Sequence, residues 1–225
     1  MSLLKKKNVL ITAGSTRGYL DAVRYITNTS TGKLGSEIAL EAMGRGAVVT
    51  YIYGADSLFP VIHERSGLKA SQLKLIEIET NNDLMKVLQE KLKNRKFDAI
   101  IHAMAVADYV PARAKQSKTS SQKKEWLIKL VKTPKVINII RASWPESFLV
   151  GFKLEVNRTK DEIIRIARRF LAKSKSNLIV ANDYKYISRN RHIAYMVTGD
   201  RKIPKPLKGK KAIARNIISY LEKIL

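Results

Sequence analysis

Residues 7–14, KNVLITAG, and residues 34–47, LGSEIALEAMGRGA, decide the fold class between them. The first stretch is apolar, rich in β-branched residues and closed by Gly14, as a buried parallel strand would be. The second stretch has apolar residues at helical spacing: Leu34, Ile38, Ala42 and Met43. Another apolar run, VVTYIYG at 48–54, follows it. Strand, crossover helix and strand make up the unit from which a right-handed parallel sheet is built.

The rest of the chain continues this alternation. Further strands are expected at 71–80, 97–109, 126–132, 147–156 and 176–183. Helices are expected at 81–96, 133–144, 159–174 and 211–225. A hairpin that turns at Gly199 and Asp200 is expected over 192–204. No repeat and no second hydrophobic centre behind a linker is visible. The sequence therefore predicts one α/β domain over 1–225, a doubly wound, Rossmann-like parallel sheet with a mobile flap and a C-terminal hairpin.

Local signals predict how several helices begin and pack. Thr159 and Glu162 match a capping box, and the asparagines at 81 and 82 can cap the helix that they open. Pro134 is expected near the first turn of its helix. One face of the last helix is expected to carry Ile213, Ile217, Tyr220, Leu221 and Ile224.

One stretch breaks the pattern. Residues 110–125, VPARAKQSKTSSQKKE, are polar and basic and have no period. Loops of this length inside a compact domain are uncommon, and most are functional lids or disordered segments. We therefore expect a long, mobile flap here.

The composition excludes several classes of function. The chain has no cysteine, which removes disulfides, thiolate nucleophiles and cysteine metal sites and fits a cytoplasmic protein. No apolar run approaches the roughly 18 residues of a membrane span, and the apolar part of the N-terminal segment is short and strand-like, unlike a signal peptide. The net charge of +24, from 43 Lys and Arg against 19 Asp and Glu, is either a nucleic-acid footprint or a solvated basic surface that also serves an anionic small ligand. Because the basic residues are spread along the chain, we favour the second interpretation and expect neither a membrane nor a nucleic-acid partner.

The stretch ITNTSTGKLG at 26–35 looks like a phosphate loop but fails the test. A P-loop needs G-x-x-x-x-G-K-[ST], whereas here Thr27 takes the place of the first glycine and Leu34 follows Lys33. The glycine turn after the first strand also lacks the G-x-G-x-x-G fingerprint, and the chain has no Tyr-x-x-x-Lys pair, which disfavours an NAD(P)-dependent reductase. Two interpretations of residues 28–33 remain open. The loop amides bind an anion, or the loop is a capping turn with Ser30 or Thr31 as the cap.

At this point the sequence resembles the phosphopantothenate–cysteine ligase family, also called phosphopantothenoylcysteine synthetase, of coenzyme A biosynthesis. The family segments T-[AS]-G-x-T, D-x-V-R and I-[ST]-N-x-S-[ST]-G are matched at Thr12–Thr16, Asp21–Arg24 and Ile26–Gly32. Further blocks follow in order at 103–109, AMAVADY; 132–135, KTPK; 151–155, GFKLE; and 181–184, ANDY. The chain looks most like the stand-alone bacterial form of the ligase.

The resemblance implies a reaction. The carboxylate of phosphopantothenate would be activated as a mixed anhydride with a nucleotide, CTP in bacteria or ATP in eukaryotes, and captured by the amine of cysteine. Mg2+ and several positive side chains would offset the repulsion among the anionic groups. The family also suggests a homodimer whose flap reaches the neighbouring subunit's site.

The resemblance also assigns residues. Asn28 would orient the acyl carbonyl as one catalytic group, and Lys118, matched by its spacing from KTPK, would be the flap lysine that holds the carboxylate against the α-phosphate. Lys115, Lys123 and Lys124 compete with Lys118 for that role. The substrate-binding residues would be Asn28, Ser30, Thr31, Gly32 and Ala105. The nucleotide-binding residues would be Gly14, Ser15, Thr16, Met104, Asp108, Thr133, Pro134, Phe152 and Lys173. No protein metal ligands are assigned.

The match has one clear departure. Many members place two lysines in the helix at 159–174, facing the triphosphate, and the aligned positions here are Phe170 and Ser174. Lys173 is the first of the possible substitutes, before Lys175 and Arg169. This departure and the net charge keep an alternative open, a basic nucleotide- or nucleic-acid-binding protein on a degenerate version of the fold.

Overall fold

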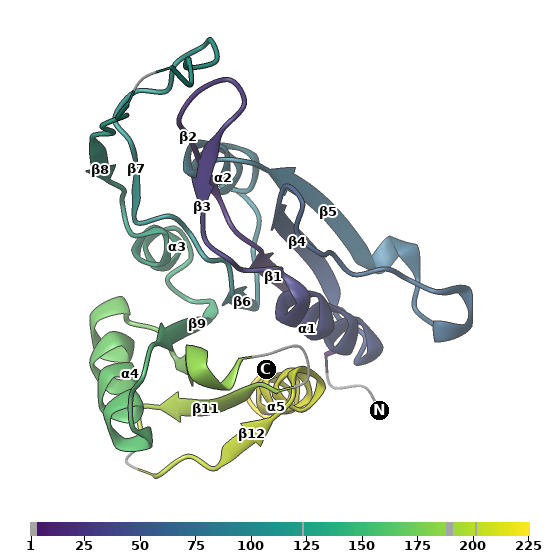
Figure 1. Ribbon diagram of the computed structural model, residues 1–225. Coiled ribbons are helices and arrows are strands. Elements are labelled where there is room, and N and C mark those ends of the chain that lie inside the picture. The colour runs from purple at the N-terminus through teal and green to yellow at the C-terminus, as the bar shows by residue number, and fades with distance from the viewer. Residues whose placement is uncertain (1–3, 123, 188–190, 201) are drawn as a thin grey trace.

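A computed structural model describes residues 4–122, 124–187, 191–200 and 202–225 (Figure 1). Its described part contains an eight-stranded sheet in the order β12-β11-β10-β9-β6-β1-β4-β5. The bounds of these strands, in chain order, are β1 Asn8–Ala13, β4 Val48–Gly54, β5 Leu73–Ile78, β6 Ala99–His102, β9 Phe148–Glu155, β10 Leu178–Asp183, β11 Ile193–Thr198 and β12 Pro206–Lys208. Neighbours pair in parallel from β5 through β10, and β11 pairs antiparallel with both of its neighbours. The predicted α/β doubly wound class is confirmed. A C-terminal hairpin is also present, but its second strand, β12, lies beyond the predicted bounds of 192–204.

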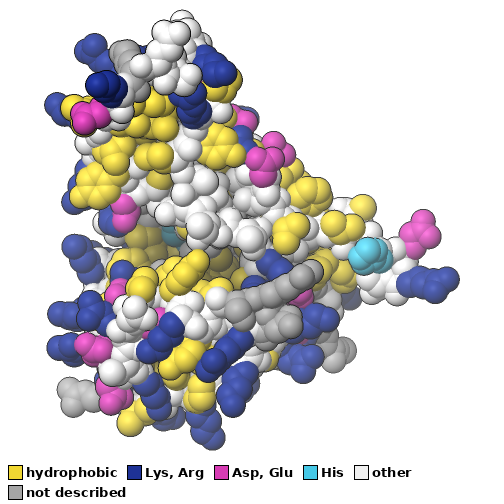
Figure 2. Space-filling view, in the orientation of Figure 1, with side chains coloured by type: hydrophobic (Ala, Val, Ile, Leu, Met, Phe, Trp, Pro, Cys, Tyr) yellow, Lys and Arg dark blue, Asp and Glu magenta, His cyan; other side chains and the backbone are white. Residues whose placement is uncertain are grey.

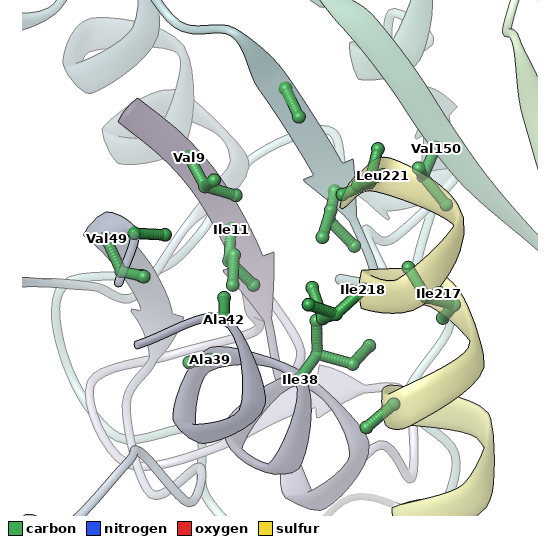
Figure 3. Packing of buried hydrophobic residues seen from close by; sticks show 14 of the residues in the cluster. Val9, Ile11, Ile38, Ala39, Ala42, Val49, Val150, Ile217, Ile218 and Leu221 are labelled. Carbon is green, nitrogen blue, oxygen red and sulfur yellow. The ribbon is translucent and has the colours of Figure 1, made fainter. Parts of the chain in front are cut away.

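Helices cover both faces of the sheet because successive residues of a strand point to opposite sides. Val9 and Ile11 of β1 join the cluster under α1 (Lys33–Gly44) and α5 (Lys210–Glu222), and Figure 3 shows these two helices packed side by side. Leu10, between them, joins the opposite cluster under α2 (Asn81–Lys86), the π-helical turn Val87–Lys91 and α3 (Val136–Ser143). On that second face α4 (Lys160–Ser174) covers β10 and β11.

Two short hairpins project from the carboxyl edge of the sheet, and we call them, with the connection 112–129, the arm. The first hairpin pairs β2 (Arg17–Tyr19) with β3 (Tyr25–Thr27), and the second pairs β7 (Tyr109–Pro111) with β8 (Leu130–Lys132). They pack so closely that an added Cβ on Gly18 would lie 3.0 Å from Cδ of Pro111. The strand expected at 126–132 is therefore wrong in extent and in place, because its ordered part pairs within the arm and not in the sheet. The strand expected at 97–109 likewise ends at His102.

Several helix caps differ from the prediction. Thr80, and neither asparagine, caps α2 through a capping box with Asp83, which leaves the Asn81 amide free to donate to the Ala107 carbonyl at 2.8 Å. Gly32, with φ 76°, is the N-cap of α1, so neither Ser30 nor Thr31 is the cap residue, although the Thr31 hydroxyl accepts the Lys33 N–H at 3.4 Å. The capping box of Thr159 and Glu162 is confirmed.

The start of α3 and the end of α5 also differ from the prediction. The helix expected from 133 begins at Val136, so Pro134 lies before its first turn. The last helix ends at Glu222, and its predicted face is buried at Ile213, Ile217 and Leu221, whereas Ile224 lies beyond the helix and is 46% exposed.

Candidate active site

The strand order reverses between β1 and β6. The chain runs from β1 outward to β4 and β5, then returns to the other side of β1 as β6. In open parallel sheets, ligands bind outside the carboxyl ends of the strands at such a switch point. The two loops that leave these strands, 14–16 and 103–108, carry many of the residues expected to bind ligand.

Backbone contacts tie these two loops together beyond the ends of the strands. The Ala105 N–H donates to the Gly14 carbonyl at 2.8 Å, and Ser15 and Ala105 form an isolated parallel bridge. The hydroxyl oxygen of Thr16, fully buried, accepts the Ala107 N–H at 2.9 Å. The loops therefore form one rigid ledge at the switch point.

Glycine is needed at two places under this ledge. Gly14 has φ 81°, and an added Cβ would lie 2.1 Å from the Oγ of Ser57. An added Cβ on Gly54 would lie 1.9 Å from the carbonyl oxygen of Ser15. Any side chain at either position would push the loop of Ser15 out of place.

Asn28 joins the ledge from the arm. It follows β3 directly, and its Nδ2 donates to the Ala105 carbonyl oxygen at 3.1 Å. The preceding hydroxyl, Oγ1 of Thr27, donates to the Thr16 carbonyl at 2.9 Å and lies 3.0 Å from the Oγ of Ser15. Asn28 itself is exposed, so its second amide N–H and its Oδ1 remain accessible to a ligand.

An ion pair lies at the end of the ledge. The Nζ of Lys135 is 2.6 Å from Oδ1 of Asp108, and both side chains are more than half exposed. Thr133 fixes the adjoining segments, since its N–H donates to the Asp108 carbonyl at 2.9 Å and its hydroxyl donates to the Ala107 carbonyl at 2.7 Å. An exposed pair of this kind contributes little to stability and can open toward a ligand. Lys135 is the last residue of the KTPK block at 132–135. The sequence analysis did not assign it to the site.

Other predicted site residues lie outside this cluster. Met104 is 7% exposed and belongs to the hydrophobic cluster under α2 and α3. Phe152, in β9, packs against the cluster under α1 and α5. The Thr31 carbonyl accepts the Leu58 N–H at 2.9 Å, so the segment of Ser30, Thr31 and Gly32 is held against the loop that follows β4.

Lys173 is not brought to the ledge. Helix α4 starts after the carboxyl end of β9 and leads into the amino end of β10, so its last turn lies at the opposite edge of the sheet. There the Asn177 N–H donates to the carbonyl of Leu149, near the start of β9. Lys173 and the ledge therefore lie at opposite edges of the sheet. This arrangement does not support the prediction that Lys173 binds a nucleotide held at the ledge.

The two departures from the family lysines have structural roles instead. Ser174 is 2% exposed, and its hydroxyl donates to the Phe170 carbonyl at 2.7 Å. The Phe170 ring packs between the two clusters on its face of the sheet, with the Nζ of Lys153 5.9 Å from the ring centroid.

The flap is anchored at the far end of the arm. Asp21, in the turn between β2 and β3, is 1% exposed, and its Oδ2 accepts the Thr119 N–H at 3.0 Å. Its Oδ1 accepts the N–H groups of Val23 and Arg24 at 3.0 and 2.9 Å, and the Arg24 guanidinium reaches both Asp21 and the Thr119 carbonyl. These N–H groups, that of Thr119 first, hold the pKa of Asp21 below its usual value.

Lys118 is fixed by this anchor at the tip of the arm. It is exposed and directly precedes Thr119, whereas Asn28 lies at the base, where β3 rejoins the sheet. The two residues expected to be catalytic are thus at opposite ends of the first hairpin within one chain. The mobility of the flap remains a prediction.

A magnesium ion fits this site only in one way. In the part of the chain that the structure describes, no three His, Cys, Asp or Glu side chains gather to hold a metal. Mg2+ usually takes one or two carboxylates and completes its shell with water and substrate phosphates. Asp108 is the carboxylate of the ledge that could serve.

None of the described helices is long and apolar enough to span a bilayer.

Comparison with known proteins gives the family. The family model of the DNA/pantothenate metabolism flavoprotein C-terminal domain (DFP) matches residues 4–225. The coenzyme A biosynthesis bifunctional protein CoaBC of Thermococcus kodakarensis is 34% identical over 222 residues, which is 99% of this chain and 52% of that protein. The chain spans about half the length of the curated relatives it matches.

Solved structures agree. The DNA/pantothenate metabolism flavoprotein from Streptococcus pneumoniae matches with a TM-score of 0.84 and 30% identity, over 97% of this chain and 100% of that chain. A Cab2 mutant in complex with phosphopantothenate-cysteine shares the fold, with a TM-score of 0.77 and 21% identity over 99% of this chain and 88% of that one. The family predicted from the ordered motifs is confirmed: the chain belongs to the DNA/pantothenate metabolism flavoprotein C-terminal domain family.

Proposed function

We propose that this chain is a phosphopantothenate–cysteine ligase of coenzyme A biosynthesis, acting in the cytoplasm. The carboxylate of phosphopantothenate attacks the α-phosphorus of CTP or ATP, and pyrophosphate leaves. The cysteine amine then attacks the acyl carbon, and the nucleoside monophosphate leaves. The observation that carries the proposal is the Asn28 amide held against the Ala105 carbonyl on the ledge that ends at Asp108. The name of the Thermococcus relative and the ligand in the Cab2 complex support the substrate class.

Asn28 acts on the acyl group in this proposal. One N–H of its amide is already used by Ala105, which fixes the plane of the amide. The second N–H is then directed at the oxygen of the acyl group, where negative charge develops when cysteine attacks. A preorganised donor at such a position lowers the barrier because it needs no reorientation during the reaction.

The nucleotide phosphates take the other side of the ledge. The backbone turn of Gly14, Ser15 and Thr16 lies there, with the Thr16 N–H already donating to the Ala105 carbonyl at 3.5 Å, and α3 begins beside it without a side-chain cap or an acid in its first turn. Lys135 leaves Asp108 to contact a phosphate, and Asp108 would then be the carboxylate that helps to hold Mg2+. Bound with the nucleotide, Mg2+ would neutralise charge on the phosphates that leave as pyrophosphate.

Lys118 needs a second subunit to reach this site. Apolar side chains gather over the arm, as Figure 2 shows, and the exposed ones are Val23, Tyr25, Tyr109, Leu127, Ile128, Leu130 and Val131. Contiguous exposed apolar surface of this kind is typical of an interface. We propose a homodimer formed through the arm, in which Lys118 of one subunit serves the ledge of the other.

The test is pyrophosphate release from the purified protein with phosphopantothenate, Mg2+ and either CTP or ATP, with and without cysteine. We expect release with at least one nucleotide, and sustained turnover only with cysteine. No release with either nucleotide, together with tight and salt-sensitive binding to nucleic acid, would replace this proposal by the nucleic-acid-binding alternative.

A further inference from the structure

Arg17 lies where the arm leaves the sheet. Its N–H donates at 2.7 Å to the carbonyl of Glu79, the residue after β5, and residue 17 forms an isolated parallel bridge with Thr80. Across the first hairpin, Arg17 of β2 is the partner of Thr27 in β3. The backbone at residue 17 therefore joins the edge strand of the sheet to both strands of the hairpin. The ligase proposal gives this residue no role.

The guanidinium of Arg17 is enclosed by groups from three segments. Its Nη2 is paired with Oδ2 of Asp56 in the loop after β4, and its Nη1 lies 3.4 Å from Oε1 of Glu79. The ring of Tyr25, in β3, faces it, with 4.3 Å between the ring centroid and Cζ. The Arg17 side chain is 12% exposed, so removal of a partner would leave a charge with little access to water. The guanidinium therefore ties β3 to the ends of β4 and β5.

Tyr19 extends this set of contacts along the hairpin. It lies two residues after Arg17 and so points to the same face, and its cross-strand partner is Tyr25. The two tyrosine rings meet edge to face with their centroids 5.8 Å apart. The Tyr19 hydroxyl donates to Oε2 of Glu79 at 2.8 Å, so each oxygen of that carboxylate accepts from a different side chain of the hairpin. One arginine and two tyrosines thus hold this face of the hairpin against the sheet.

The position of Asn28 depends on the same junction. The hydroxyl of Thr27, opposite Arg17, donates at 2.9 Å to the carbonyl of Thr16. Asn28 directly follows Thr27 and donates to the Ala105 carbonyl at 3.1 Å. A small rotation of the hairpin about residue 17 would carry Nδ2 of Asn28 away from that carbonyl, and hydrogen bonds weaken steeply with such changes in geometry. A displacement of about 1 Å at a reacting group can cost about 10²-fold in rate.

We propose that Arg17 is a positioning residue for the ligase reaction: it holds the first hairpin against the sheet and so fixes the Asn28 amide at the Ala105 carbonyl. This inference rests on the proposed function in one respect, the action of Asn28 on the acyl group. A lysine cannot replace Arg17, because a planar guanidinium makes two ion pairs and stacks on a ring at once, whereas an ammonium is a compact point charge. Arg17→Lys therefore keeps the charge and loses the geometry.

The first measurement needs no substrate. The full chain is labelled with 15N in its asparagine side chains, and nuclear magnetic resonance identifies the Asn28 signals by their absence from Asn28→Asp. In Arg17→Lys we expect the Asn28 amide signals to shift toward those of a free amide in water. Those of Asn216, on α5, are expected to stay in place. Unchanged Asn28 signals would overturn the proposal.

Arg45→Lys is the matched control. Arg45 is also paired with two carboxylates, Glu41 and Glu222. It lies at the end of α1, which leads into the amino end of β4, at the opposite edge of the sheet from Asn28. Urea unfolding should show both lysine variants to be less stable than the wild type, whereas only Arg17→Lys should move the Asn28 signals. An equal shift in both variants would mean a general loosening of the fold and would refute the positioning role.

Asp56→Asn weakens the same contact and leaves Arg17 in place, which keeps the test decisive should Arg17→Lys not fold. Asp56 is exposed and has φ 62°, a left-handed conformation in which Asn and Asp are both enriched. We expect its Asn28 signals to shift in the same direction as in Arg17→Lys, by a smaller amount. Asn28 signals that did not move in Asp56→Asn would contradict the proposal.

Kinetics then show whether Arg17 acts through Asn28. We expect Arg17→Lys to slow the capture of the acyl-nucleotide by cysteine at least about tenfold and to change KM for phosphopantothenate by less than about twofold, because Asn28 stabilises charge that develops only in the transition state. Arg17→Lys with Asn28→Asp should be no slower than Asn28→Asp alone, since residues that act as one unit are not additive. Losses that multiplied in the double variant would overturn the proposal. If even the wild type showed no ligase activity, the proposed function would fail, and the amide signals would still decide whether Arg17 positions Asn28.

Discussion

The Asn28 amide nitrogen lies 3.1 Å from the carbonyl oxygen of Ala105, although the two residues are 77 positions apart in the chain. This contact joins the end of the arm to the loop that follows β6, across the switch point of the sheet. It also orients Asn28, because an amide that donates from one side of its nitrogen has its other groups fixed in the same plane. The geometry of the site therefore depends on a hydrogen bond from the side chain at position 28. A side chain without an N–H or O–H group cannot make this bond.

Asn28→Asp tests that dependence. The carboxylate cannot donate to the Ala105 carbonyl and would repel it, so the side chain turns away from the ledge. We expect the acyl-nucleotide to form, with pyrophosphate released in a first turnover, and its capture by cysteine to slow by about 10²–10³-fold, the usual loss for one oxyanion donor. Rapid-quench measurement of pyrophosphate and of amide product separates the two steps.

Asn216→Asp is the matched control. Asn216 also donates its amide to a backbone oxygen, that of Ala212 at 2.8 Å, but it is exposed on α5. The control is expected to retain capture within about twofold, as surface substitutions away from a site usually do. If Asn28→Asp captured cysteine at the wild-type rate, Asn28 would have no part in the chemistry.

Lys118→Ala addresses the earlier step. The side chain is exposed, so its removal is expected to leave folding unchanged, while pyrophosphate release in the absence of cysteine falls by at least about a hundredfold. Lys115→Ala in the same connection is the control and is expected to release pyrophosphate normally. Were the two variants equally active, the role would pass to another lysine of the flap.

Mixing subunits tests whether Lys118 acts across a dimer. A mixture of the Lys118→Ala and Asn28→Asp proteins forms heterodimers in which one of the two sites has both residues intact if Lys118 acts in trans. We expect such a mixture to recover up to about a quarter of the wild-type activity, since half of the dimers are heterodimers with one intact site each. Action within one chain would leave the mixture as inactive as its components.

The sheet could be predicted because most of its inner strands are buried. Runs such as 8–13 and 178–183 are mostly apolar and have β-branched residues, which helices use less. The ledge could be predicted in part, since parallel strands end at one edge and the motifs follow the strands. The family resemblance supplied Asn28, for which the stretch alone slightly favoured a capping turn.

The arm, the helix caps and the far strand of the C-terminal hairpin could not be predicted, each for a physical reason. Strand β8 is exposed at all three of its residues, so it shows no alternation, and its pairing depends on a distant strand. The asparagines that open α2 are good caps in isolation, but Thr80 and Asp83 offer two mutual hydrogen bonds. The turn at Gly199 and Asp200 predicts a hairpin over 192–204, but its second strand pairs at Pro206–Lys208, outside those bounds, because this three-residue edge strand is too short to show a pattern.

Asp21→Asn is expected to release the flap. Oδ2 of Asp21 accepts the Thr119 N–H and the Arg24 guanidinium, and an amide nitrogen in its place would face two donors without a hydrogen bond. We expect trypsin to cut the connection 112–129 several times faster than in the wild type, at its own lysines and arginines. Asp200→Asn, which alters an exposed carboxylate that accepts only from the Thr198 hydroxyl among the described contacts, should leave the cutting rate unchanged. Equal rates in all three proteins would show that Asp21 does not anchor the flap.

His102 should make the protein less stable in mild acid. Burial beneath the ledge lowers the pKa of this ring from 6.5 to about 4, and its Nδ1 lies 2.6 Å from the Thr12 hydroxyl. Above pH 6.5 the ring is neutral in both the folded and the unfolded chain. As the pH falls from 6.5 toward 4, only the unfolded chain binds the proton, so the free energy of unfolding falls by about 1.4 kcal/mol per pH unit, about 3 kcal/mol in total. His102→Asn places an amide near the position of Nδ1 and cannot titrate, so urea unfolding should show a shallower pH dependence over this interval. Parallel curves for the two proteins would mean that folding leaves the pKa of His102 unchanged.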